Sequence, residues 1–292
     1  MGDSPSAERR LGSGQVRALL KDQAPLLASA PLKKVAEGWD NAIWRLGADL
    51  AVRLPRRAEA ARLIGHENTA LPMLAPRLAR VGVLSPVPVV CGEPSGEFPW
   101  PWSIVPWLPG APALAQPRDK RAAWAPKLAR ALEALHRPAP TDAPVNPLRG
   151  VPLQARETSI RERLERHPEH AALGEHWDAG LAVAPSRERV WIHGDLHPGN
   201  LLVHHGDLAA IIDFGDVTAG DAAYDLACGW MLFDDAGREH FHRATQDRYD
   251  ASTWVRARAW AAGFAVLLLD SNDDRPELRR LGQDIASALS AG

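Results

Sequence analysis

A short stretch in the second half of the chain concentrates side chains that can move protons and bind metal ions. Residues 191–216 read WIHGDLHPGNLLVHHGDLAAIIDFGD. The members that could do chemistry are His193, Asp195, His197, Asn200 and Asp213. Such a set could form a zinc-dependent hydrolase centre of the H-x-D-x-H type or a phosphoryl-transfer site, and the spacing must decide between them.

The two apolar segments around His205-Gly206-Asp207 predict a tight β-hairpin. If Gly206 and Asp207 are the two turn residues, Asn200 and Asp213 lie opposite each other at the base of the hairpin. Opposite side chains on an antiparallel pair are about 5 Å apart, so an amide oxygen and a carboxylate there could share one cation. Oxygen ligands of this kind suit Mg²⁺, which prefers one or two carboxylate-type ligands plus substrate phosphates.

Asp195 lies on the loop that leads into this hairpin, before Asn200. From there it could orient a substrate hydroxyl and accept its proton as a γ-phosphate is transferred. The zinc alternative needs ligands from distant segments, and the other histidines show no second cluster of ligand type. Because His204 and His205 are consecutive on a strand, their side chains point to opposite faces. The residues therefore favour phosphoryl transfer.

The elements that must position these groups change in type along the chain. Three short strands are predicted over 32–36, 41–46 and 50–54, followed by a helix over 58–78 in which Pro72 predicts a break or a new start. Further strands are predicted over 87–91 and 102–105, and the second half is mostly helical. This pattern predicts an α+β fold with a boundary after Pro106. Residues 1–106 and 107–292 form the two expected parts, and residues 1–14 are expected to be disordered.

Composition excludes several classes of function. The net charge of −2 over 292 residues offers no basic stripe for nucleic acid. The longest apolar run, around Ala259 to Leu269, is too short to span a bilayer, and the N-terminus has no apolar stretch of signal-peptide type. Cys91 and Cys228 are the only cysteines and cannot build a disulfide framework. We therefore expect a cytoplasmic protein without a nucleic-acid or membrane partner.

The run His193-Gly194-Asp195-Leu196-His197-Pro198-Gly199-Asn200, followed by Ile212-Asp213-Phe214-Gly215, resembles the aminoglycoside phosphotransferase family. The resemblance implies a bilobal protein-kinase-like fold, with a nucleotide-binding N-terminal lobe and a C-terminal lobe that binds the acceptor. It implies Asp195 as catalytic base, Asn200 and Asp213 as Mg²⁺ ligands, and ATP or GTP as phosphate donor. It also implies structural support from His193 and from Asp225, which would brace the catalytic loop; for Asp225, a charge at a helix N-terminus is the alternative.

The same resemblance assigns nucleotide-binding roles in the first half. Gly38 lies where the family's nucleotide-covering loop is expected. Arg53 stands in place of the family's phosphate-binding lysine, a departure that keeps the positive charge but replaces a point charge by a fork. Glu67 is its expected partner, with Glu59 as the substitute.

The segment from Trp102 to Gly110 resembles the family's interlobe hinge. Backbone groups of Ile104, Val105 and Trp107 would contact the nucleobase there, whereas Pro106 has no N–H to offer.

The acceptor is less well defined. In the family fold the C-terminal helices flank the acceptor site, so Asp234, Asp235 and Asp270 are candidates to bind a polycationic aminoglycoside. The alternative is that helix ends and loops are simply acidic and solvated. Trp230, Trp254 and Trp260 could wall an apolar pocket suited to a macrolide, although core packing is their more ordinary role.

Two other functions stay open. One is a metabolic kinase that acts on choline, homoserine or a sugar. The other is a nucleotide-binding regulator with a kinase-like fold and no transfer, against which the intact Asp195, Asn200 and Asp213 argue. The short segment between Asp213 and Asp221 argues against a protein kinase, because it leaves no room for an extended activation loop.

Overall fold

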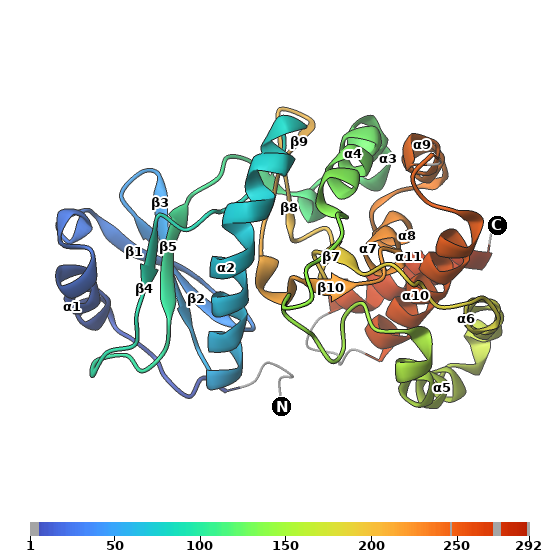
Figure 1. The fold of residues 1–292 in the computed structure, drawn as a ribbon, viewed down its shortest axis with the longest axis horizontal. Helices are drawn as coiled ribbons and strands as arrows, with labels where there is room; N and C mark the ends of the chain where they lie inside the picture. The colour runs from blue at the N-terminus through green and yellow to red at the C-terminus, as the bar shows by residue number, and fades with distance from the viewer. Residues whose placement is uncertain (1–5, 246, 271–275, 291–292) are drawn as a thin grey trace. The chain divides into compact units, whose positions relative to one another are not determined.

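The computed structural model describes residues 6–245, 247–270 and 276–290, and these fall into two compact units. Among the described residues, the sheet unit comprises 6–109 together with 210–216, and the helical unit comprises 110–209 and the residues from Val217 onward. The predicted boundary lies after Pro106, whereas the sheet unit extends to Pro109 and also includes 210–216, a segment that begins in the second strand of the hairpin. The predicted α+β class is confirmed (Figure 1).

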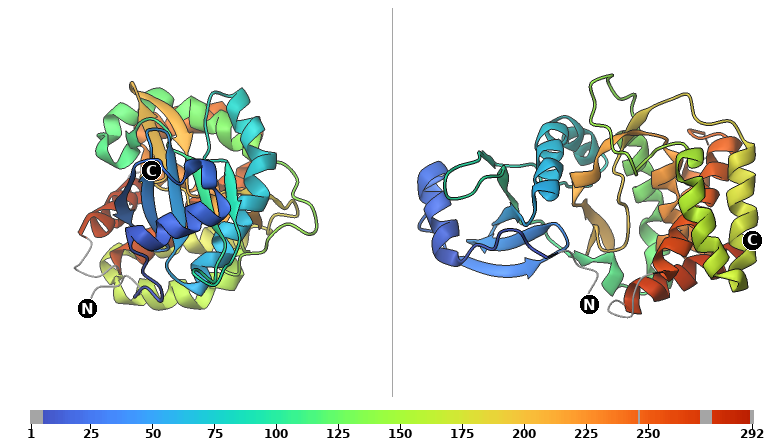
Figure 2. Two further views of the ribbon diagram at one scale, coloured as in Figure 1. Left: turned by 90° about the vertical axis from the view of Figure 1, so that its left-hand side faces the viewer. Right: turned by 90° about the horizontal axis from the view of Figure 1, so that it is seen from below.

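The sheet unit contains an antiparallel five-stranded sheet in the order β1-β2-β3-β5-β4. Its strands are β1 (Leu32–Glu37), β2 (Asn41–Leu46), β3 (Leu50–Pro55), β4 (Val90–Gly92) and β5 (Trp102–Pro106). Helix α1 (Ser13–Gln23), which the sequence reasoning missed, buries Val16, Leu19 and Leu20 against one face. Helix α2 (Ala58–Arg80) covers the opposite face (Figures 1 and 2). Residues 1–5 of the stretch expected to be disordered lie outside the described residues.

Helix α2 runs without interruption through two prolines, so the predicted break at Pro72 is wrong. Proline removes one helical hydrogen bond and crowds the carbonyl four residues back, at a cost of about 3 kcal/mol. Leucines on both sides of Pro72 are buried, among them Leu71, Leu74 and Leu78. Because this continuous apolar stripe packs against the sheet unit, tertiary packing outweighs the local cost of the prolines.

The helical unit surrounds two small sheets, one with the order β6-β8-β9 and one that pairs β7 with β10. Its strands are β6 (Ala111–Pro112), β7 (Val190–Ile192), β8 (Leu201–His204), β9 (Asp207–Ile211), whose last two residues belong to the sheet unit, and β10 (Thr218–Gly220). Its α-helices are α3 (Arg118–Arg121), α4 (Ala125–Leu135), α5 (Glu157–Arg166), α6 (Ala171–Ala182), α7 (Ala223–Leu226), α8 (Cys228–Leu232), α9 (Asp235–Thr245), α10 (Ala251–Leu269) and α11 (Pro276–Ser290). Short 3₁₀ turns are η1 (Pro25–Leu27) and η6 (Phe214–Asp216) in the sheet unit, and η2 (Ala113–Ala115), η3 (Ala122–Trp124), η4 (Leu153–Arg156) and η5 (Pro168–His170) in the helical unit.

Helix α10 is the centre of the helical unit and packs against α6 and α11. A Cβ placed on Gly180 of α6 would lie 2.3 Å from the Cβ of Ala259, so small residues on both helices allow the close approach. The apolar run that ends at Leu269 is thus explained as a buried core helix. None of the helices in the described part of the chain combines the length and hydrophobicity needed to cross a bilayer. Helix α11 was not predicted, and the chain between β10 and α9 forms two short helices, α7 and α8.

Candidate active site

Strand β7 is followed by residues 193–200, the candidate catalytic loop, which is called the catalytic loop below. A buried carboxylate binds two backbone amides of this loop. The backbone amides of His193 and Gly194 donate to Asp225 at 2.7 and 3.0 Å. Gly194 has a φ of +83°, a conformation that glycine adopts at little cost. The carboxylate of Asp225 therefore holds two consecutive backbone amides of this loop.

Asp195 and Asn200 are held together by this loop. The side-chain amide of Asn200 donates to the Asp195 carbonyl oxygen at 2.9 Å and approaches Asp195 Oδ2 at 3.3 Å. The backbone amide of Asn200 donates to the His197 carbonyl at 2.9 Å. Asn200 is buried, whereas about a third of the Asp195 side chain is exposed (34%), so the carboxylate remains accessible to an acceptor.

The two loop histidines face the backbone. His193 Nδ1 accepts from the Asp195 amide at 3.1 Å, and His197 Nδ1 accepts from the Gly199 amide at 3.0 Å. A ring nitrogen that accepts such a bond is not available as a zinc ligand. Within the described ranges, no group of three or more His, Cys, Asp or Glu is arranged to hold a metal ion. The geometry gives the H-x-D-x-H zinc alternative no support.

Behind the loop lies a fully buried polar chain that the sequence reasoning did not foresee. His136 Nε2 lies 3.1 Å from Asp225 Oδ2, and His136 Nδ1 lies 2.7 Å from Tyr249 Oη. Burial by itself would raise the pKa of Asp225, but the hydrogen bond from His136, the nearby histidine charges and the amide of Gly194 outweigh it and lower this pKa. Asp225 is therefore a stable buried anion, able to hold the loop amides strongly.

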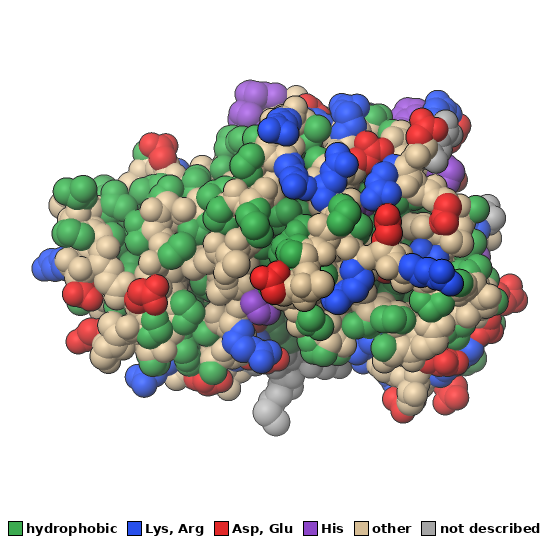
Figure 3. All heavy atoms as spheres, viewed as in Figure 1, with side chains coloured by type: hydrophobic (Ala, Val, Ile, Leu, Met, Phe, Trp, Pro, Cys, Tyr) green, Lys and Arg blue, Asp and Glu red, His purple; other side chains and the backbone are tan. Residues whose placement is uncertain are grey.

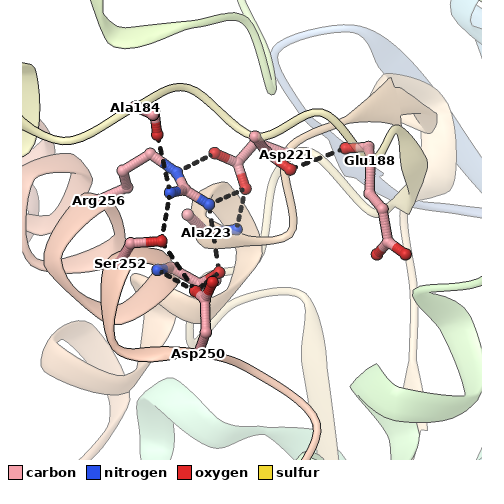
Figure 4. Close-up of polar contacts among 9 residues, drawn as sticks. Ala184, Glu188, Asp221, Ala223, Asp250, Ser252 and Arg256 are labelled. Atoms are coloured by element: carbon pink, nitrogen blue, oxygen red, sulfur yellow. Dashed lines mark hydrogen bonds and ion pairs between the residues drawn. The ribbon is translucent and has the colours of Figure 1, made fainter.

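Helix α7, which carries Asp225, is itself anchored by a salt bridge (Figure 4). Arg256 of α10 donates from Nε to Asp221 Oδ2 at 2.6 Å and from Nη1 to the Ala184 carbonyl at 3.1 Å. The other oxygen, Asp221 Oδ1, accepts from the amide of Ala223, the first residue of α7, at 3.0 Å. Arg256 of α10 thus holds Asp221, which in turn binds the first residue of α7, the helix that carries Asp225.

The hairpin forms, but its predicted turn is displaced by one residue. Strand β8 ends at His204 and β9 begins at Asp207, so the turn residues are His205 and Gly206, with φ of +51° and +81°. Positive φ at both central residues is the type I′ turn, which places glycine second. The prediction with Gly206 and Asp207 in the turn is therefore wrong, and the register derived from it does not hold.

In the sheet unit, the structure pairs Arg53 with Glu67. Arg53 Nη1 donates to both carboxylate oxygens of Glu67, and Nη2 donates to Asp213 Oδ1 at 3.1 Å. Burial alone would lower the pKa of Arg53, but the charges of Glu67 and Asp213 raise it above its ordinary value. Glu59, the substitute partner, instead pairs with Arg57 at 3.0 Å.

Asp213 has an uncommon backbone conformation. Its φ is +63°, in the left-handed region, which Asp tolerates better than most residues. The next residue, Phe214, is fully buried, and a Cβ on Gly215 would lie 3.1 Å from Leu63 of α2. Close packing after Asp213 fixes the chain, while half of the carboxylate stays exposed (51%). Backbone strain kept in this way is typical of functional positions.

The glycine-containing turn between β1 and β2 is held by arginines. The amide of Gly38 donates to the Asn41 carbonyl at 2.9 Å, and the Gly38 carbonyl accepts from Arg56 at 2.7 Å. Arg57 binds Asp40 Oδ1 at 2.7 Å. The turn expected to cover the nucleotide is therefore ordered by contacts within the sheet unit.

Two of the expected hinge groups are already engaged in the sheet. The Trp107 amide donates to the Asp49 carbonyl at 2.7 Å, and the Ile104 carbonyl accepts from the Val89 amide at 2.8 Å. Val105 is registered opposite Ala51 of β3. Backbone groups alternate in direction along a strand, so the Pro106 carbonyl points to the same side as the Ile104 carbonyl, toward β4. Strand β4 begins with Val90 opposite Ile104, and no residue of β4 is paired with Pro106. The Pro106 carbonyl oxygen is thus the hydrogen-bond acceptor at this end of β5. The Trp107 amide is not available to a nucleobase, because it is bonded to the Asp49 carbonyl.

The three aspartates expected to bind a cationic acceptor are all in contact with other groups. Asp234 Oδ1 accepts from the Gly237 amide at 2.9 Å, and Asp235 Oδ1 accepts from Arg238 at 2.6 Å, both ordinary contacts at a helix start. Asp270 binds Arg163, Arg166 and His167. Asp270 therefore joins α10 to α5 and does not offer a free carboxylate to a polycation.

The three tryptophans expected to line an apolar pocket do not pack together as one group. Trp260 is buried and packs on Trp177 and Tyr224, with ring centroids 5.8 and 4.7 Å away. Trp230 and Trp254 contact each other at 6.2 Å. Core packing explains Trp260.

Sequence reasoning missed one charged residue at the catalytic loop. Arg149 Nη2 lies 3.3 Å from Asp195 Oδ1, but Arg149 belongs to the proline-rich segment 138–152, in which the sequence analysis named no functional residue. The one local signal was Asn146, whose type favours turns and side-chain-to-backbone hydrogen bonds.

Comparison with known proteins shows the family of the chain and its fold. Residues 31–260 match the model of the phosphotransferase enzyme family (APH). The GDP complex of aminoglycoside 2′-phosphotransferase-IIIa superposes with a TM-score of 0.70 at 18% identity, covering 96% of this chain and 99% of that one. Macrolide 2′-phosphotransferase MphH from Brachybacterium faecium superposes with a TM-score of 0.62 at 26% identity, covering 94% and 98%.

A further structure, aminoglycoside phosphotransferase APH(2'')-Ib with ADP bound, gives a TM-score of 0.60 at 17% identity, covering 96% of this chain and 99% of that one. The predicted kinase-like fold is thereby confirmed. The family match spans both units, including Arg53, Asp195, Asn200 and Asp213. The chain belongs to the phosphotransferase enzyme family of small-molecule kinases.

Proposed function

We propose that this phosphotransferase moves the γ-phosphate of ATP or GTP to a hydroxyl group of a small molecule, with Asp195 as the base. The observation that carries the proposal is the catalytic loop, in which an accessible carboxylate is held between Asn200 and a loop backbone braced by Asp225. A fixed carboxylate beside a substrate hydroxyl orients it and accepts its proton during transfer.

The two residues predicted as metal ligands, Asn200 and Asp213, carry oxygen donors that suit Mg²⁺. Asn200 donates through its side-chain nitrogen to the Asp195 carbonyl, a bond that does not use its amide oxygen, and Asp213 keeps a half-exposed carboxylate. We assign these two oxygen donors to the metal, because amide and carboxylate oxygens are ligands that Mg²⁺ accepts. When bound, magnesium neutralises the charge that develops on the phosphates during transfer.

The nucleotide is assigned to the sheet unit. Arg53, fixed by Glu67, supplies a positive charge for phosphate, Gly38 belongs to the covering turn, and the end of β5 that extends beyond β4 offers the Pro106 carbonyl to the nucleobase. The relatives that were solved with GDP or ADP support a nucleoside phosphate as ligand.

For the acceptor, the candidates are aminoglycosides, macrolides and metabolic alcohols such as choline, homoserine or a sugar. Asp270 is bound by Arg163, Arg166 and His167, and on the face of the helical unit seen in Figure 3 basic and acidic side chains are interspersed rather than gathered into an acidic surface. These observations favour an acceptor with few positive charges, such as a macrolide or a neutral alcohol, over a polycation.

The test is mass spectrometry of an acceptor panel incubated with the protein, Mg²⁺ and either ATP or GTP. The wild-type protein should add one phosphate to a macrolide or a neutral alcohol, and Asp195→Ala should reduce the rate by about 10²–10⁴-fold while Mg²⁺-nucleotide binding persists. The matched control is Asp207→Ala, which removes an exposed carboxylate of the neighbouring hairpin. Bound nucleotide without an adduct on any compound would favour the regulator, and a preference for aminoglycosides would contradict the assigned acceptor class.

A further inference from the structure

A guanidinium group lies next to the proposed base. Arg149 Nη2 is 3.3 Å from Asp195 Oδ1, and Arg149 Nη1 donates to Tyr224 Oη at 3.0 Å. We propose that Arg149 is a positioning residue, which holds the Asp195 carboxylate in the orientation needed to accept the proton of the acceptor hydroxyl. The inference rests on the proposed function, because it takes Asp195 to be the base.

The backbone that carries Arg149 is fixed to the sheet below the catalytic loop. Asn146 Oδ1 accepts from the amides of Leu148 and Arg149 at 2.9 and 3.2 Å, which closes a tight turn. The Asn146 amide donates to Thr218 Oγ1 at 3.1 Å, and this hydroxyl donates to the Pro144 carbonyl at 2.7 Å. The turn is thus attached to β10, which pairs with β7.

Gly150 fixes the chain on the other side of Arg149. Its φ is +62°, and a Cβ there would lie 2.3 Å from Ile192 Cδ1 and 3.1 Å from the Cα of Gly220. Its carbonyl accepts from the Asp221 amide at 3.1 Å. Since Ile192 immediately precedes the catalytic loop, Arg149 and Asp195 are both built on the same strand pair, and their separation is set by the fold rather than by a mobile linker.

Tyr224 holds the guanidinium from behind. Its ring is buried and packs on Trp260 and Phe264, with centroids 4.7 and 5.0 Å away. The adjacent residue on α7 is Asp225, which holds the amides of His193 and Gly194. One short helix therefore supports the loop twice, through its backbone by Asp225 and through its catalytic side chain by Tyr224 and Arg149.

The contacts of the carboxylate show what Arg149 adds. Asp195 Oδ2 is approached by Asn200 Nδ2 at 3.3 Å and by His197 Nε2 at 3.7 Å, so the groups on this oxygen come from the loop itself. Asp195 Oδ1 is approached by Arg149. With both oxygens in contact the carboxylate plane is fixed, whereas loss of Arg149 leaves it held on one side. Misorientation of a base reduces turnover more than it reduces binding.

The experiment compares Arg149→Met, Arg149→Lys and Tyr224→Phe with the wild-type protein, using the acceptor identified by the panel. Arg149→Met should lower kcat by about 10–100-fold, with little change in the KM of the acceptor or the Kd of Mg²⁺-nucleotide. Arg149→Lys should recover part of the loss, because an ammonium keeps the charge but cannot bridge two partners as a fork does. Tyr224→Phe should give a smaller loss of kcat.

The matched control is Arg189→Met, since Arg189 binds the carbonyl of Ala219 in β10 at 3.0 Å and has the same side chain to lose. It should leave kcat unchanged. An Arg149→Met protein with wild-type kcat would overturn the proposal, and so would a raised acceptor KM at unchanged kcat, which would make Arg149 an acceptor-binding residue.

A second measurement does not depend on turnover. Crystal structures of the wild-type protein and of Arg149→Met should show the Asp195 carboxylate rotated in the variant, and an unchanged carboxylate would overturn the proposal. If the wild-type protein phosphorylates nothing, the proposed function fails, yet the crystal structures still decide whether Arg149 orients Asp195.

Discussion

The sheet unit and the helical unit hold their candidate catalytic residues by different means. In the sheet unit, Arg53, Glu67 and Asp213 are joined by ion pairs between side chains. In the helical unit, a single carboxylate, that of Asp225, holds the catalytic loop by its backbone amides. Side-chain pairs specify charges, whereas backbone bonds specify the path of the chain. Neutralising a charge should therefore affect nucleotide binding most in the first unit, and both folding and turnover in the second.

The largest effect is expected for the backbone brace. Asp225→Ala leaves two buried amides and His136 without their acceptor, and each such loss costs about 1–3 kcal/mol. We expect the free energy of unfolding to fall by about 3–5 kcal/mol, measured by urea denaturation, together with loss of transfer activity. Asp207→Ala, which removes an exposed carboxylate, is the control. A stable, active Asp225→Ala protein would contradict the comparison between the two units, because the catalytic loop would then keep its backbone conformation without Asp225.

The next effect is expected for the side-chain pair. Glu67→Gln keeps the shape of Glu67 but removes the charge that fixes Arg53, while Asp213 still provides one ion pair. We expect Mg²⁺-nucleotide to bind about 10-fold more weakly and the free energy of unfolding to fall by about 1–2 kcal/mol. Nucleotide affinity can be measured by calorimetry, with Glu59→Gln at the exposed pair with Arg57 as control. Unchanged affinity in Glu67→Gln would show that the ion pair serves only the fold.

The ion pairs of Asp270 test whether the charge of a carboxylate contributes to the free energy of unfolding in the helical unit as it does for Glu67 in the sheet unit. Burial by itself would raise its pKa, but hydrogen bonds from Arg166, His167 and Arg163 outweigh burial and lower the pKa from 3.8 to about 2. A carboxyl group whose pKa is lower in the folded than in the unfolded protein stabilises the fold at pH values above its unfolded-state pKa. This stabilisation is lost as the pH falls toward the folded-state pKa.

Asp270→Asn should therefore lower the free energy of unfolding by about 1–2 kcal/mol at pH 7, a figure reduced for partial solvent exposure. The difference from the wild-type protein should narrow as pH falls from about 4 toward 2. Denaturation curves at several pH values measure it. A difference that grows at low pH would mean that the carboxyl group is stabilised in its protonated form.

The smallest effect is expected where the backbone conformation alone is at stake. His205 lies in the type I′ turn with φ of +51°, a conformation that asparagine adopts more readily. His205→Asn should raise the free energy of unfolding by about 0.5 kcal/mol or less, independently of salt. His205→Val, in which a β-branched residue must adopt positive φ, should lower it by about 1 kcal/mol. Thermal unfolding of both variants checks the order, and a reversed order would contradict the turn type.

Local rules predicted well what depends on near neighbours. The strands of the N-terminal sheet, the hairpin and the loop between His193 and Asn200 follow from side-chain alternation, turn residues and a long ordered motif. The exact turn was misplaced because Gly206 suits either position of a two-residue turn, and only the observed φ values distinguish them. Pro72 was misjudged because a local cost was weighed without the packing that outweighs it.

The order and types of residues by themselves determined the α+β class and the catalytic motif, and they predicted Glu67 as the partner of Arg53 with Glu59 as the substitute, since these rest on short-range spacing and on a family pattern. Only the tertiary structure decided that Asp270 is neutralised by α5, that His136 and Tyr249 complete the chain behind Asp225, and that Arg149 reaches Asp195. The physical reason is that these contacts join segments far apart in sequence. Which charges meet there depends on how helices and strands pack, and no local periodicity encodes it.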